Sequence, residues 1–369
     1  MRDLVRRIDA ATPPGRDRAL DALRAFAILG VVLGHWLVTA LVTDSGTLRA
    51  VSPLHAMPAL TPVSWLLQPL AVFFMVGGRV AAASHASRRV PYRRWLGVRL
   101  SRLFGPVVAV TAVWSAAAGA MLAAGTSWET LHALLKLVLS PLWFLLVLAV
   151  LTAATPLVAR LHPLWPFAVV LLVDLVRFGL DGPADLGWLN VAAGWLVPYC
   201  LGAATPSRGN RAGWALLFGG AAATAALVLW AGYPAAMVGV PGARISNLNP
   251  PTLAAVTFGL AQCGAALLLL GPLRRVLRRP AVWAAVALLN LSAMTVFLWH
   301  QTAMMAVTAL GLLAGRPLPG LHTLPDGPDW VLARLAWLPV FAAALLVCRS
   351  AFHIHELRRP AGAQEVRHV

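Results

Sequence analysis

Charged residues are scarce in this sequence of 369 residues, and lysine is almost absent. Only 12% of the residues are charged, which is about half the fraction found in soluble domains. Lys136 is the single lysine among 30 basic residues, and 59% of the chain is hydrophobic. This composition argues against a pair of water-soluble domains and predicts one all-α, polytopic integral membrane domain. The excess of arginine over lysine, with abundant Ala and Gly, indicates a bacterial genome rich in GC pairs.

Cysteine is also rare. Cys200, Cys263 and Cys348 lie within or at the edges of apolar runs. Three cysteines cannot pair completely, and their spacing matches neither a disulfide framework nor a zinc site. The sequence contains no Gly-x-Ser-x-Gly elbow, Walker loop or Gly-x-Gly-x-x-Gly turn. We therefore expect neither a metal ion nor a permanently bound cofactor.

The net charge of +17 would suit a nucleic-acid-binding protein. The arginines, however, form short clusters between long apolar runs, which is the pattern that orients membrane proteins. We therefore expect no nucleic-acid partner. A basic start before an apolar stretch also resembles a secretory signal peptide, but residues 20–42 contain Arg24 and His35 and exceed the usual core of roughly 7–15 residues. A retained first span is the better interpretation.

Apolar runs long enough to cross a bilayer occur along the whole chain. About 20 consecutive apolar residues span the hydrocarbon core, and the segments between such runs hold most of the Pro, Gly and clustered Arg. Ten spans are expected from this pattern. They cover residues 20–42, 63–83, 103–124, 138–158, 163–180, 188–204, 213–232, 252–271, 282–312 and 330–349.

The distribution of basic residues orients these spans. If the N-terminus is cytoplasmic, the inner segments hold 22 of the 30 basic residues and the outer connections hold three. This asymmetry follows the positive-inside rule and predicts that both termini are cytoplasmic. The expected parts are a basic segment at 1–19, a transmembrane domain at 20–350 and a cytoplasmic tail at 351–369. Any chemistry must then take place among the helices.

The first span carries ionisable side chains along one stripe. Arg24 and His35 are eleven residues apart, which is three helical turns plus about 20°, with an axial rise of about 16 Å. Asp21 lies one turn before Arg24, in range for an ion pair. Arg24 could simply reach the inner interface, tied to Asp21, but His35 falls beyond mid-membrane, where ionisable groups are commonly functional. Histidine accepts protons near neutral pH, so His35 is the candidate base, aligned with Arg24.

Further arginines lie at the inner ends of the second and third spans. Arg99 and Arg102 form an Arg-x-x-Arg pair one turn apart, and Arg79 follows the two glycines of FFMVGGRV. The other arginines of this loop fit the positive-inside rule. Arg99 and Arg102 extend into the helix, where their guanidinium groups could match phosphate oxygens. The two glycines admit a ligand or simply permit tight helix packing.

A late span carries the remaining candidates. The stretch NLSAMTVFLWHQ, residues 290–301, contains Asn290 and His300 as secondary candidates, as Asp21 is in the first span. His300 either orients an acceptor or bonds across helices.

Two polar features lie outside these motifs. Asp174 and Arg177, three residues apart in the fifth span, are expected to pair. That pair is as compatible with a structural role as with a functional one. The polar, Pro-containing outer segment at 242–253 is a candidate lid.

Taken in order along the chain, these motifs resemble those of the membrane-bound acyltransferase 3 family. The motifs are LDALRAFAILGVVLGHW, FFMVGG, RRWLGVRLSRLFGP, PLWFL and LWHQ, and the resemblance covers residues 18–350. Its most specific elements are the spacing of Arg24 and His35 and the pair of Arg99 and Arg102.

The resemblance implies an integral-membrane O-acyltransferase. Members of the family move an acyl group, often acetyl from cytoplasmic acetyl-CoA, to a hydroxyl of a glycan or a glycosylated metabolite. The phosphates of CoA would lie at Arg79, Arg99 and Arg102. The thioester would meet His35, acting as a base or as a covalent acyl relay. The implied partners are membrane lipid, acyl-CoA and the glycosylated acceptor, in a bacterial plasma membrane. Many relatives carry an SGNH-type domain after the last span, and we expect none here.

Two other classes of function fit parts of the pattern. A multi-pass transporter or flippase also carries charges within its helices, although no inverted repeat is visible and the basic line of the first span is unpaired. A non-catalytic assembly subunit would leave His35 without a purpose.

Overall fold

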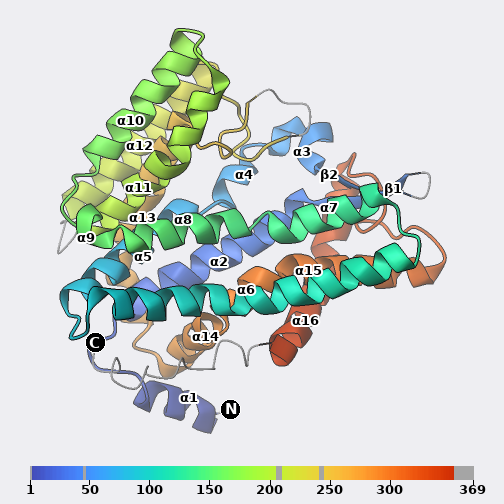
Figure 1. The fold of residues 1–369 in the computed structure, drawn as a ribbon, viewed down its shortest axis with the longest axis horizontal. Helices are drawn as coiled ribbons and strands as arrows, with labels where there is room; N and C mark the ends of the chain where they lie inside the picture. Colours follow the sequence, from blue (N-terminus) through green and yellow to red (C-terminus); the bar gives the residue numbers. More distant parts are fainter. Residues whose placement is uncertain (1, 45–46, 205–209, 241–244, 353–369) are drawn as a thin grey trace.

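The computed structural model describes residues 2–44, 47–204, 210–240 and 245–352 (Figure 1). Helices form most of this part, and its two strands make one short hairpin. The expected all-α architecture is therefore confirmed. The greater part of the expected tail, from residue 353 onward, lies outside the described residues.

Nine helical segments of the described part are long and apolar enough to cross a membrane. Each overlaps one of the expected spans, although several begin about ten residues earlier or later than expected, so the protein is a multi-pass membrane protein. The nine segments are Arg18–Val38, Pro58–Ala86, Tyr92–Ala123, Trp128–Ala153, Ala184–Ala203, Asn210–Trp230, Leu253–Val276, Ala293–Ala314 and Pro328–Phe352.

Turns divide several of these segments into shorter elements. Prolines mark some of the divisions, because a proline lacks the N–H that continues a helix. In chain order the elements are α1 (Arg2–Ala10), α2 (Arg18–Val38), β1 (Ala40–Asp44), β2 (Thr47–Val51), α3 (Pro53–Ala56), η1 (Pro58–Leu60), α4 (Val63–Leu66), α5 (Leu70–Ala86), α6 (Tyr92–Ala123), α7 (Trp128–Leu139), α8 (Leu142–Ala153), α9 (Thr155–Val158), α10 (Leu164–Asp174), η2 (Leu175–Gly179), η3 (Ala184–Trp188), α11 (Leu189–Ala203), α12 (Asn210–Trp230), α13 (Leu253–Val276), α14 (Pro280–Leu291), α15 (Ala293–Gly311), η4 (Leu312–Ala314) and α16 (Pro328–Phe352).

The fifth expected span, at 163–180, is shorter than the others. It consists of the α-helix α10 followed by the π-helical turn η2, which ends at Gly179. Figure 1 shows α10 beside α11, α12 and α13, and it packs against α11 and α13. This segment therefore joins the helical bundle without reaching the length of the nine longer segments.

The ninth expected span, at 282–312, is two helices instead of one. The helix breaks at Ser292, whose φ of −116° and ψ of 13° leave the helical region. The side chain of Ser292 accepts a hydrogen bond from Nε of Arg349 at 2.5 Å. A contact from α16 at this point accompanies the break, which apolarity alone could not reveal. Only α15 of the pair is long enough to cross the membrane.

The first span ends earlier than its apolarity suggests. We expected helix to residue 42, but α2 ends at Val38 and the chain turns into β1. Thr39 is extended, and β1 pairs antiparallel with β2, Ala40 opposite Val51. The residues after 38 include β-branched side chains, which favour strands. The expectation missed this preference because it counted only apolarity.

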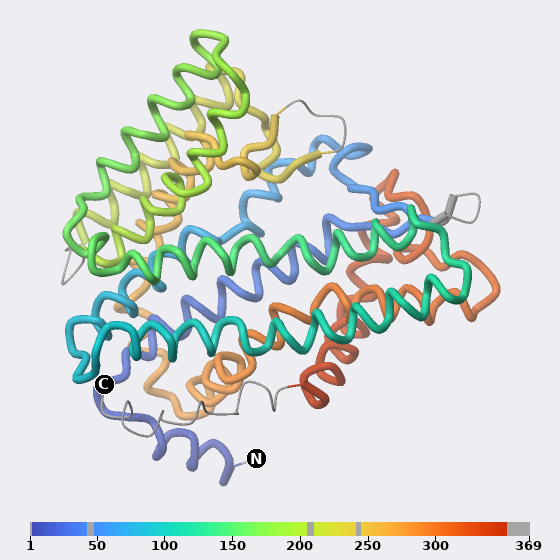
Figure 2. The backbone as a smooth tube through the Cα atoms, in the orientation of Figure 1, coloured from blue at the N-terminus to red at the C-terminus, as the bar shows by residue number. Residues whose placement is uncertain are grey.

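The helices form two groups that share a boundary (Figure 1). In one group α10, α11, α12 and α13 pack side by side, with α12 against α13 and α11 against α5. In the other, α2 lies among α5, α13, α14 and α15, while α15 also packs against α16. The backbone trace shows α2 crossing the middle of the molecule (Figure 2). This central position places the candidate residues of α2 inside the protein.

Glycines permit the closest of these helix contacts. A Cβ atom at Gly78 would overlap the main-chain carbonyl of Tyr199, where α5 meets α11. At Gly34 it would lie 2.9 Å from the carbonyl oxygen of Leu67, and at Gly30 it would lie 2.6 Å from the ring of Pro69. The glycine of FFMVGG at position 78 therefore serves tight packing, one of the two roles that its sequence allowed.

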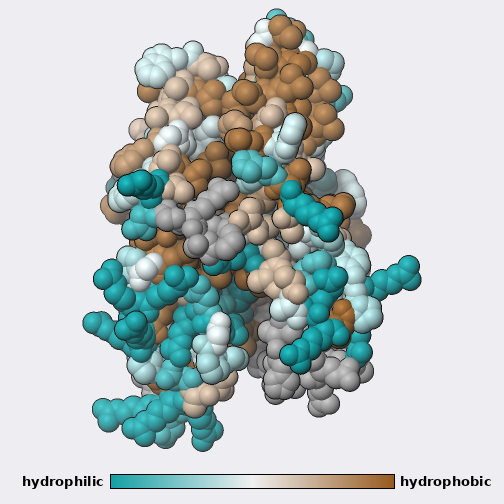
Figure 3. Space-filling model, turned by 90° about the vertical axis from the view of Figure 1, so that its left-hand side faces the viewer, coloured by the Kyte–Doolittle hydropathy of each residue, from teal (hydrophilic) through white to brown (hydrophobic). Residues whose placement is uncertain are grey.

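One end of the molecule is rich in arginine. Asp17 caps α2 there and accepts hydrogen bonds from Arg274 of α13, at 2.6 Å from Nη2. Arg18 donates to the carbonyl of Leu277 and lies over the ring of Trp283. Figure 3 views the side on which α1 and the α5–α6 loop lie, and it shows hydrophilic side chains over the lower half and hydrophobic ones above. We call this arginine-rich end the basic end.

Candidate active site

Arg24 and His35 lie on one unbroken helix, α2. Nε of Arg24 donates a hydrogen bond to Oδ1 of Asn290 at 2.6 Å, and its Nη2 lies 3.3 Å from Oδ1 of Asp21. Asn290 in turn donates through Nδ2 to the main-chain carbonyl of Asp21 at 2.9 Å. The ion pair expected between Arg24 and Asp21 is therefore present, and Asn290 of α14 completes it.

His35 meets α15 at the other end of the same helix face. Its Nδ1 lies 3.1 Å from Nε2 of Gln301, and its ring centroid lies 5.1 Å from that of His300. His300 is completely buried, with Nδ1 2.6 Å from the carbonyl oxygen of Phe297. A carbonyl can only accept, so Nδ1 of His300 carries the proton and its Nε2 is unprotonated in the neutral ring. Two candidate histidines from distant parts of the sequence thus lie side by side.

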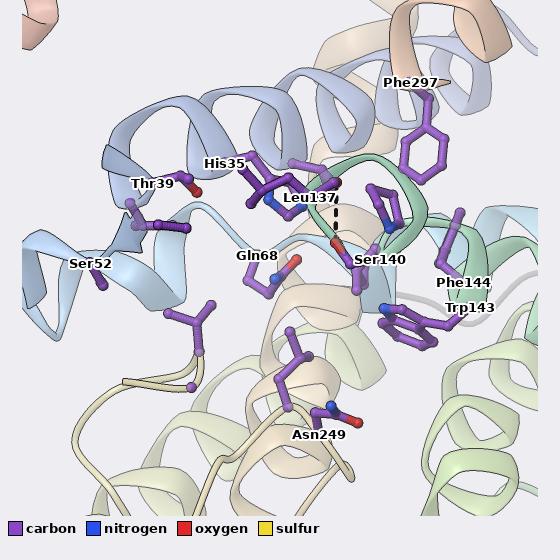
Figure 4. Close-up of a pocket in the computed structure, with 18 of the residues that line it drawn as sticks. His35, Thr39, Ser52, Gln68, Leu137, Ser140, Trp143, Phe144, Asn249 and Phe297 are labelled. Atoms are coloured by element: carbon purple, nitrogen blue, oxygen red, sulfur yellow. Dashed lines mark hydrogen bonds between the residues drawn. The ribbon is translucent and has the colours of Figure 1, made fainter. Parts of the chain in front are cut away.

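His35 lines a cavity, whereas His300 is not among the described residues that line it. The cavity holds about 400 Å³ and lies beside the C-terminal half of α2 (Figure 4). Small-molecule sites commonly fall between roughly 300 and 1,000 Å³. The close-up shows Gln68, Ser140 and Trp143 around the space below His35. The described lining residues are Val31, His35, Val38, Thr39, Ala50, Val51, Ser52, Gln68, Leu70, Leu137, Ser140, Pro141, Trp143, Phe144, Val238, Gly239, Leu248, Asn249 and Phe297.

None of the three arginines expected at the phosphates lines the cavity. Arg79 lies in the second half of α5, within electrostatic range of Asp17 at the basic end, and Arg99 and Arg102 lie in the first third of α6. Nη2 of Arg99 donates to the carbonyl of Val80 at 3.3 Å, and its guanidinium lies 5.0 Å from the ring centroid of Trp95. Arg102 is exposed, and Arg79 is half-buried. The structure therefore separates these arginines from His35 and leaves them near the opposite end of α2.

The arginines of the basic end also lower the pKa of one carboxyl group, that of Asp17. Burial alone would raise the pKa of Asp17. The hydrogen bond and charge of Arg274, with smaller contributions from the main-chain N–H of Ala19 and from Arg79, hold that pKa below its ordinary value of 3.8. An anionic group is thus stabilised where these arginines gather. The same field would favour a phosphate.

A family model described as an acyltransferase domain, that of acyltransferase 3, matches residues 17–351. The chain belongs to the acyltransferase 3 family. The match extends from the start of α2 almost to the end of α16 and includes Arg24, His35 and the cavity. No curated protein and no solved structure matches the chain significantly.

Membership in the acyltransferase 3 family makes this multi-pass chain a membrane acyltransferase. It therefore favours the enzyme over the transporter or flippase that the composition also allowed. In the described part of this acyltransferase, no group of three or more His, Cys, Asp or Glu is placed to hold a metal ion.

Sequence analysis of this acyltransferase did not single out Trp36 or Arg334. Nε1 of Trp36 donates to the carbonyl of His300 at 2.9 Å. Arg334 is 1% exposed and donates to the carbonyls of Trp36, Thr39 and Gly320 at 2.6–2.9 Å. An arginine inside a span is itself a signal of function, but its partners are main-chain atoms that no motif reveals.

The sequence also did not identify Gln68 and Gln301 as candidate site residues. Gln68 lines the cavity, and its Oε1 has no hydrogen-bond partner among the described residues. Gln301 was visible as a polar residue beside His300, yet its contact is with His35, 266 residues earlier. Only the packing of α15 on α2 brings the two together.

The acidic residue expected to pair with Arg177 does so within a larger network. Asp174 is 1% exposed and lies 3.5 Å from Nη1 of Arg177. It also accepts hydrogen bonds from Nδ2 of Asn190 at 2.9 Å, the hydroxyl of Tyr233 at 3.0 Å and the main-chain N–H of Leu253 at 2.6 Å. These bonds tie α10 and α11 to the chain around α13, which is a structural role.

The candidate lid at 242–253 lies partly outside the described residues. Of its described part, Leu248 and Asn249 line the cavity. Asn247 is fully buried and donates through Nδ2 to the carbonyls of Pro234 and Ala236. This segment therefore forms part of the cavity wall.

Proposed function

We propose that this acyltransferase is an O-acyltransferase of the bacterial plasma membrane. It takes an acyl group, expected to be acetyl, from acyl-CoA on the cytoplasmic side. It transfers this group to a hydroxyl of a glycan or a glycosylated metabolite. The observation that carries the proposal is that His35 lines a cavity of about 400 Å³ while Arg24, on the same helix, lies toward the basic end. One helix would thus connect the donor's phosphates with the reacting atoms.

The chemistry requires one base. The neutral ring of His35 removes the proton from the acceptor hydroxyl as the oxygen attacks the thioester carbonyl. A C–O bond forms, the C–S bond of the tetrahedral intermediate breaks, and the thiolate of CoA leaves. The imidazolium then returns the proton to that sulfur, so the products are the O-acyl ester and CoA thiol. The neutral polar groups that line the cavity, such as Gln68 and Ser140, would bind the acceptor's other hydroxyls.

A covalent relay differs from this scheme in one step. The ring nitrogen of His35 would attack the thioester first and release CoA before the acceptor binds. One equivalent of CoA would then appear per protein in the absence of acceptor. A rapid-mixing measurement of CoA release separates the two routes.

The donor would bind through the arginines of the basic end. Guanidinium groups at Arg79, Arg99 and Arg102 suit the phosphates of CoA because each presents several N–H donors in a planar fork. Arg24 would hold the donor where its pantetheine arm passes along α2. Its Nε and Nη2 atoms contact Asn290 and Asp21, and its Nη1 atom would contact a group of the donor.

The test is acyl transfer by the purified protein in vesicles supplied with acetyl-CoA and a crude acceptor fraction from the producing cell. His35→Ala and His35→Gln should bind acetyl-CoA normally while transfer falls by about 10²–10⁴-fold, because glutamine cannot take the proton. The matched control is His132→Gln at an exposed histidine of α7, which should transfer normally. Transfer by His35→Gln at the rate of the unaltered protein would refute the role of His35.

A further inference from the structure

The contact between His35 and Gln301 carries information about proton positions. Nδ1 of His35 lies 3.1 Å from the carboxamide nitrogen of Gln301. Gln301 is 1% exposed, and its Oε1 has no hydrogen-bond partner among the described residues. With the carboxamide in this orientation, its N–H donates to Nδ1, and the single proton of the neutral ring lies on Nε2.

With its proton on Nε2, the ring of His35 cannot act as the base. Because Nδ1 is occupied by Gln301, Nε2 is the ring nitrogen left for the acceptor hydroxyl, and it must be unprotonated to remove a proton. The ring proton must then lie on Nδ1, which needs an acceptor. A half-turn of the Gln301 carboxamide exchanges its oxygen and nitrogen and places Oε1 against Nδ1–H. The same oxygen also suits the imidazolium, which carries N–H groups on both nitrogens.

The surrounding bonds hold these two side chains at a fixed separation. Trp36, directly after His35, donates its indole N–H to the carbonyl of His300, directly before Gln301, at 2.9 Å. Arg334 donates to the carbonyl of Trp36 at 2.7 Å and to that of Thr39 at 2.6 Å. The flanking residues thus lock α2 against α15, and the carboxamide can turn without any movement of the helices.

We propose that Gln301 is the positioning residue of His35: its Oε1 accepts the Nδ1–H bond in the reactive state and so keeps Nε2 free as the base. This inference rests on the proposed role of His35. Gln301 does not touch the substrate; it selects the tautomer of the ring and stabilises the imidazolium. It has the place that a carboxylate or amide takes behind a catalytic histidine in other enzymes.

The direction in which the titration midpoint of His35 shifts tests the proposal, and no acceptor is needed. Diethyl pyrocarbonate reacts with imidazole only when the ring is unprotonated. We would measure its reaction with His35 by peptide mass spectrometry at a series of pH values, with the full-length protein in nanodiscs. The midpoint of the resulting curve reports the titration of the ring. If Oε1 of Gln301 accepts from Nδ1–H, Gln301→Met removes a bond that favours the imidazolium, and the midpoint moves to lower pH. Gln301→Glu places a carboxylate there, and the midpoint moves to higher pH by about one unit.

Other groups near His35 are common to all the variants. The ring of His300 faces it at 5.1 Å, and the guanidinium of Arg334 bonds to the carbonyls beside it. Their influence on the midpoint is therefore the same in every sample. Thr308→Val is the matched control, since Thr308 is another buried polar residue of α15 whose hydroxyl bonds to its own helix, at the carbonyl of Met304.

Kinetics provide the second measurement. Gln301→Met should lower kcat by at least about tenfold with little change in KM for acetyl-CoA, and Gln301→Glu should recover much of the loss. A midpoint in Gln301→Met that is unchanged, or that moves to higher pH, overturns the proposal, because a purely donating Gln301 would stabilise the neutral ring. If Gln301→Met does not fold, the second variant decides: a midpoint for His35 in Gln301→Glu equal to that of the unaltered protein overturns the proposal.

Failure of the proposed function would look different. An unaltered protein that transfers no acyl group, with modification curves that move as expected, would leave the bond between Gln301 and His35 established and remove only its role in transfer.

Discussion

Arg24 donates a hydrogen bond to Asn290 at 2.6 Å, and eleven residues later in both chain segments His35 meets Gln301. Because the two spacings are equal, residues 290–301, which belong mostly to α15, run parallel to α2 and in register with it. The break at Ser292 lies between the two contacts. One helix face therefore links the residue near the basic end with the residue at the cavity.

Arg24→Lys should impair donor binding more than chemistry. Lysine keeps the charge but loses the fork with which Arg24 reaches Asn290 and Asp21 together. We expect KM for acetyl-CoA to rise by about tenfold, equivalent to about 1.4 kcal/mol, with a smaller change in kcat. Arg16→Lys is the control, because Arg16 also pairs with Asp21 but its side chain is 44% exposed. Equal KM values in both variants would contradict a donor role for Arg24.

Arg99→Ala and Arg102→Ala should weaken binding of acyl-CoA. Each removes a charge-assisted contact to phosphate, worth about 1.5–3 kcal/mol. Isothermal titration with acetyl-CoA measures the effect, and desulfo-CoA analogues lacking the 3′-phosphate show which phosphate is involved. Arg93→Ala, at an exposed arginine in the first turn of α6, is the matched control. Unaltered affinity in the double variant would mean that both arginines serve only membrane orientation.

Arg334→Met should destabilise the protein strongly. Arg334 donates to three main-chain carbonyls from a buried position, and each carbonyl left without a donor costs about 1–3 kcal/mol. Arg334→Lys should recover little, since an ammonium cannot match three separated acceptors. The melting temperature in detergent reports the change. The control Arg316→Met lies at an exposed position, and a similar melting temperature for both variants would exclude the bracing role.

Acid should remove the contribution of Asp17 to stability. The pKa of Asp17 lies below its ordinary value of 3.8 because Arg274, the N–H of Ala19 and Arg79 together outweigh the effect of burial. A carboxyl group whose folded pKa is depressed stabilises the fold above its unfolded pKa, and this contribution is lost as pH falls through the folded value. The unaltered protein should therefore melt above Asp17→Asn at pH 7, and the difference should shrink below pH 3.8. A difference that does not change with pH would show that the effect is not titration.

Labelling should place the basic end in the cytoplasm. The basic asymmetry predicts that residues 84–102 and 272–281 lie inside and that 233–251 lies outside. In a protein without its native cysteines, Arg93→Cys should react with an impermeant maleimide only after the membrane is opened. Arg316→Cys, which lies in an expected outer connection, should react in intact cells. The opposite pattern would reverse the proposed sides for donor and acceptor.

Several features could be predicted from the sequence because they depend on local composition. Nine apolar segments correspond to expected spans since length and apolarity are sufficient to cross a bilayer. The position of Arg24 and His35 on one helix follows from the regular pitch of that helix. The family motifs lie on the same helices, and the family model matches residues 17–351.

The site itself depended on contacts between distant segments. The sequence marked His35 and Gln301 as polar residues of two spans, but their bond requires that α2 pack in register against α15. The end of α2 at Val38 and the break at Ser292 coincide with contacts from Arg334 and Arg349 of α16. Apolarity predicts that a segment lies in the membrane, because it depends on each side chain alone. Which side chains meet there depends on how helices separated by hundreds of residues pack, and that was decided only by the tertiary structure.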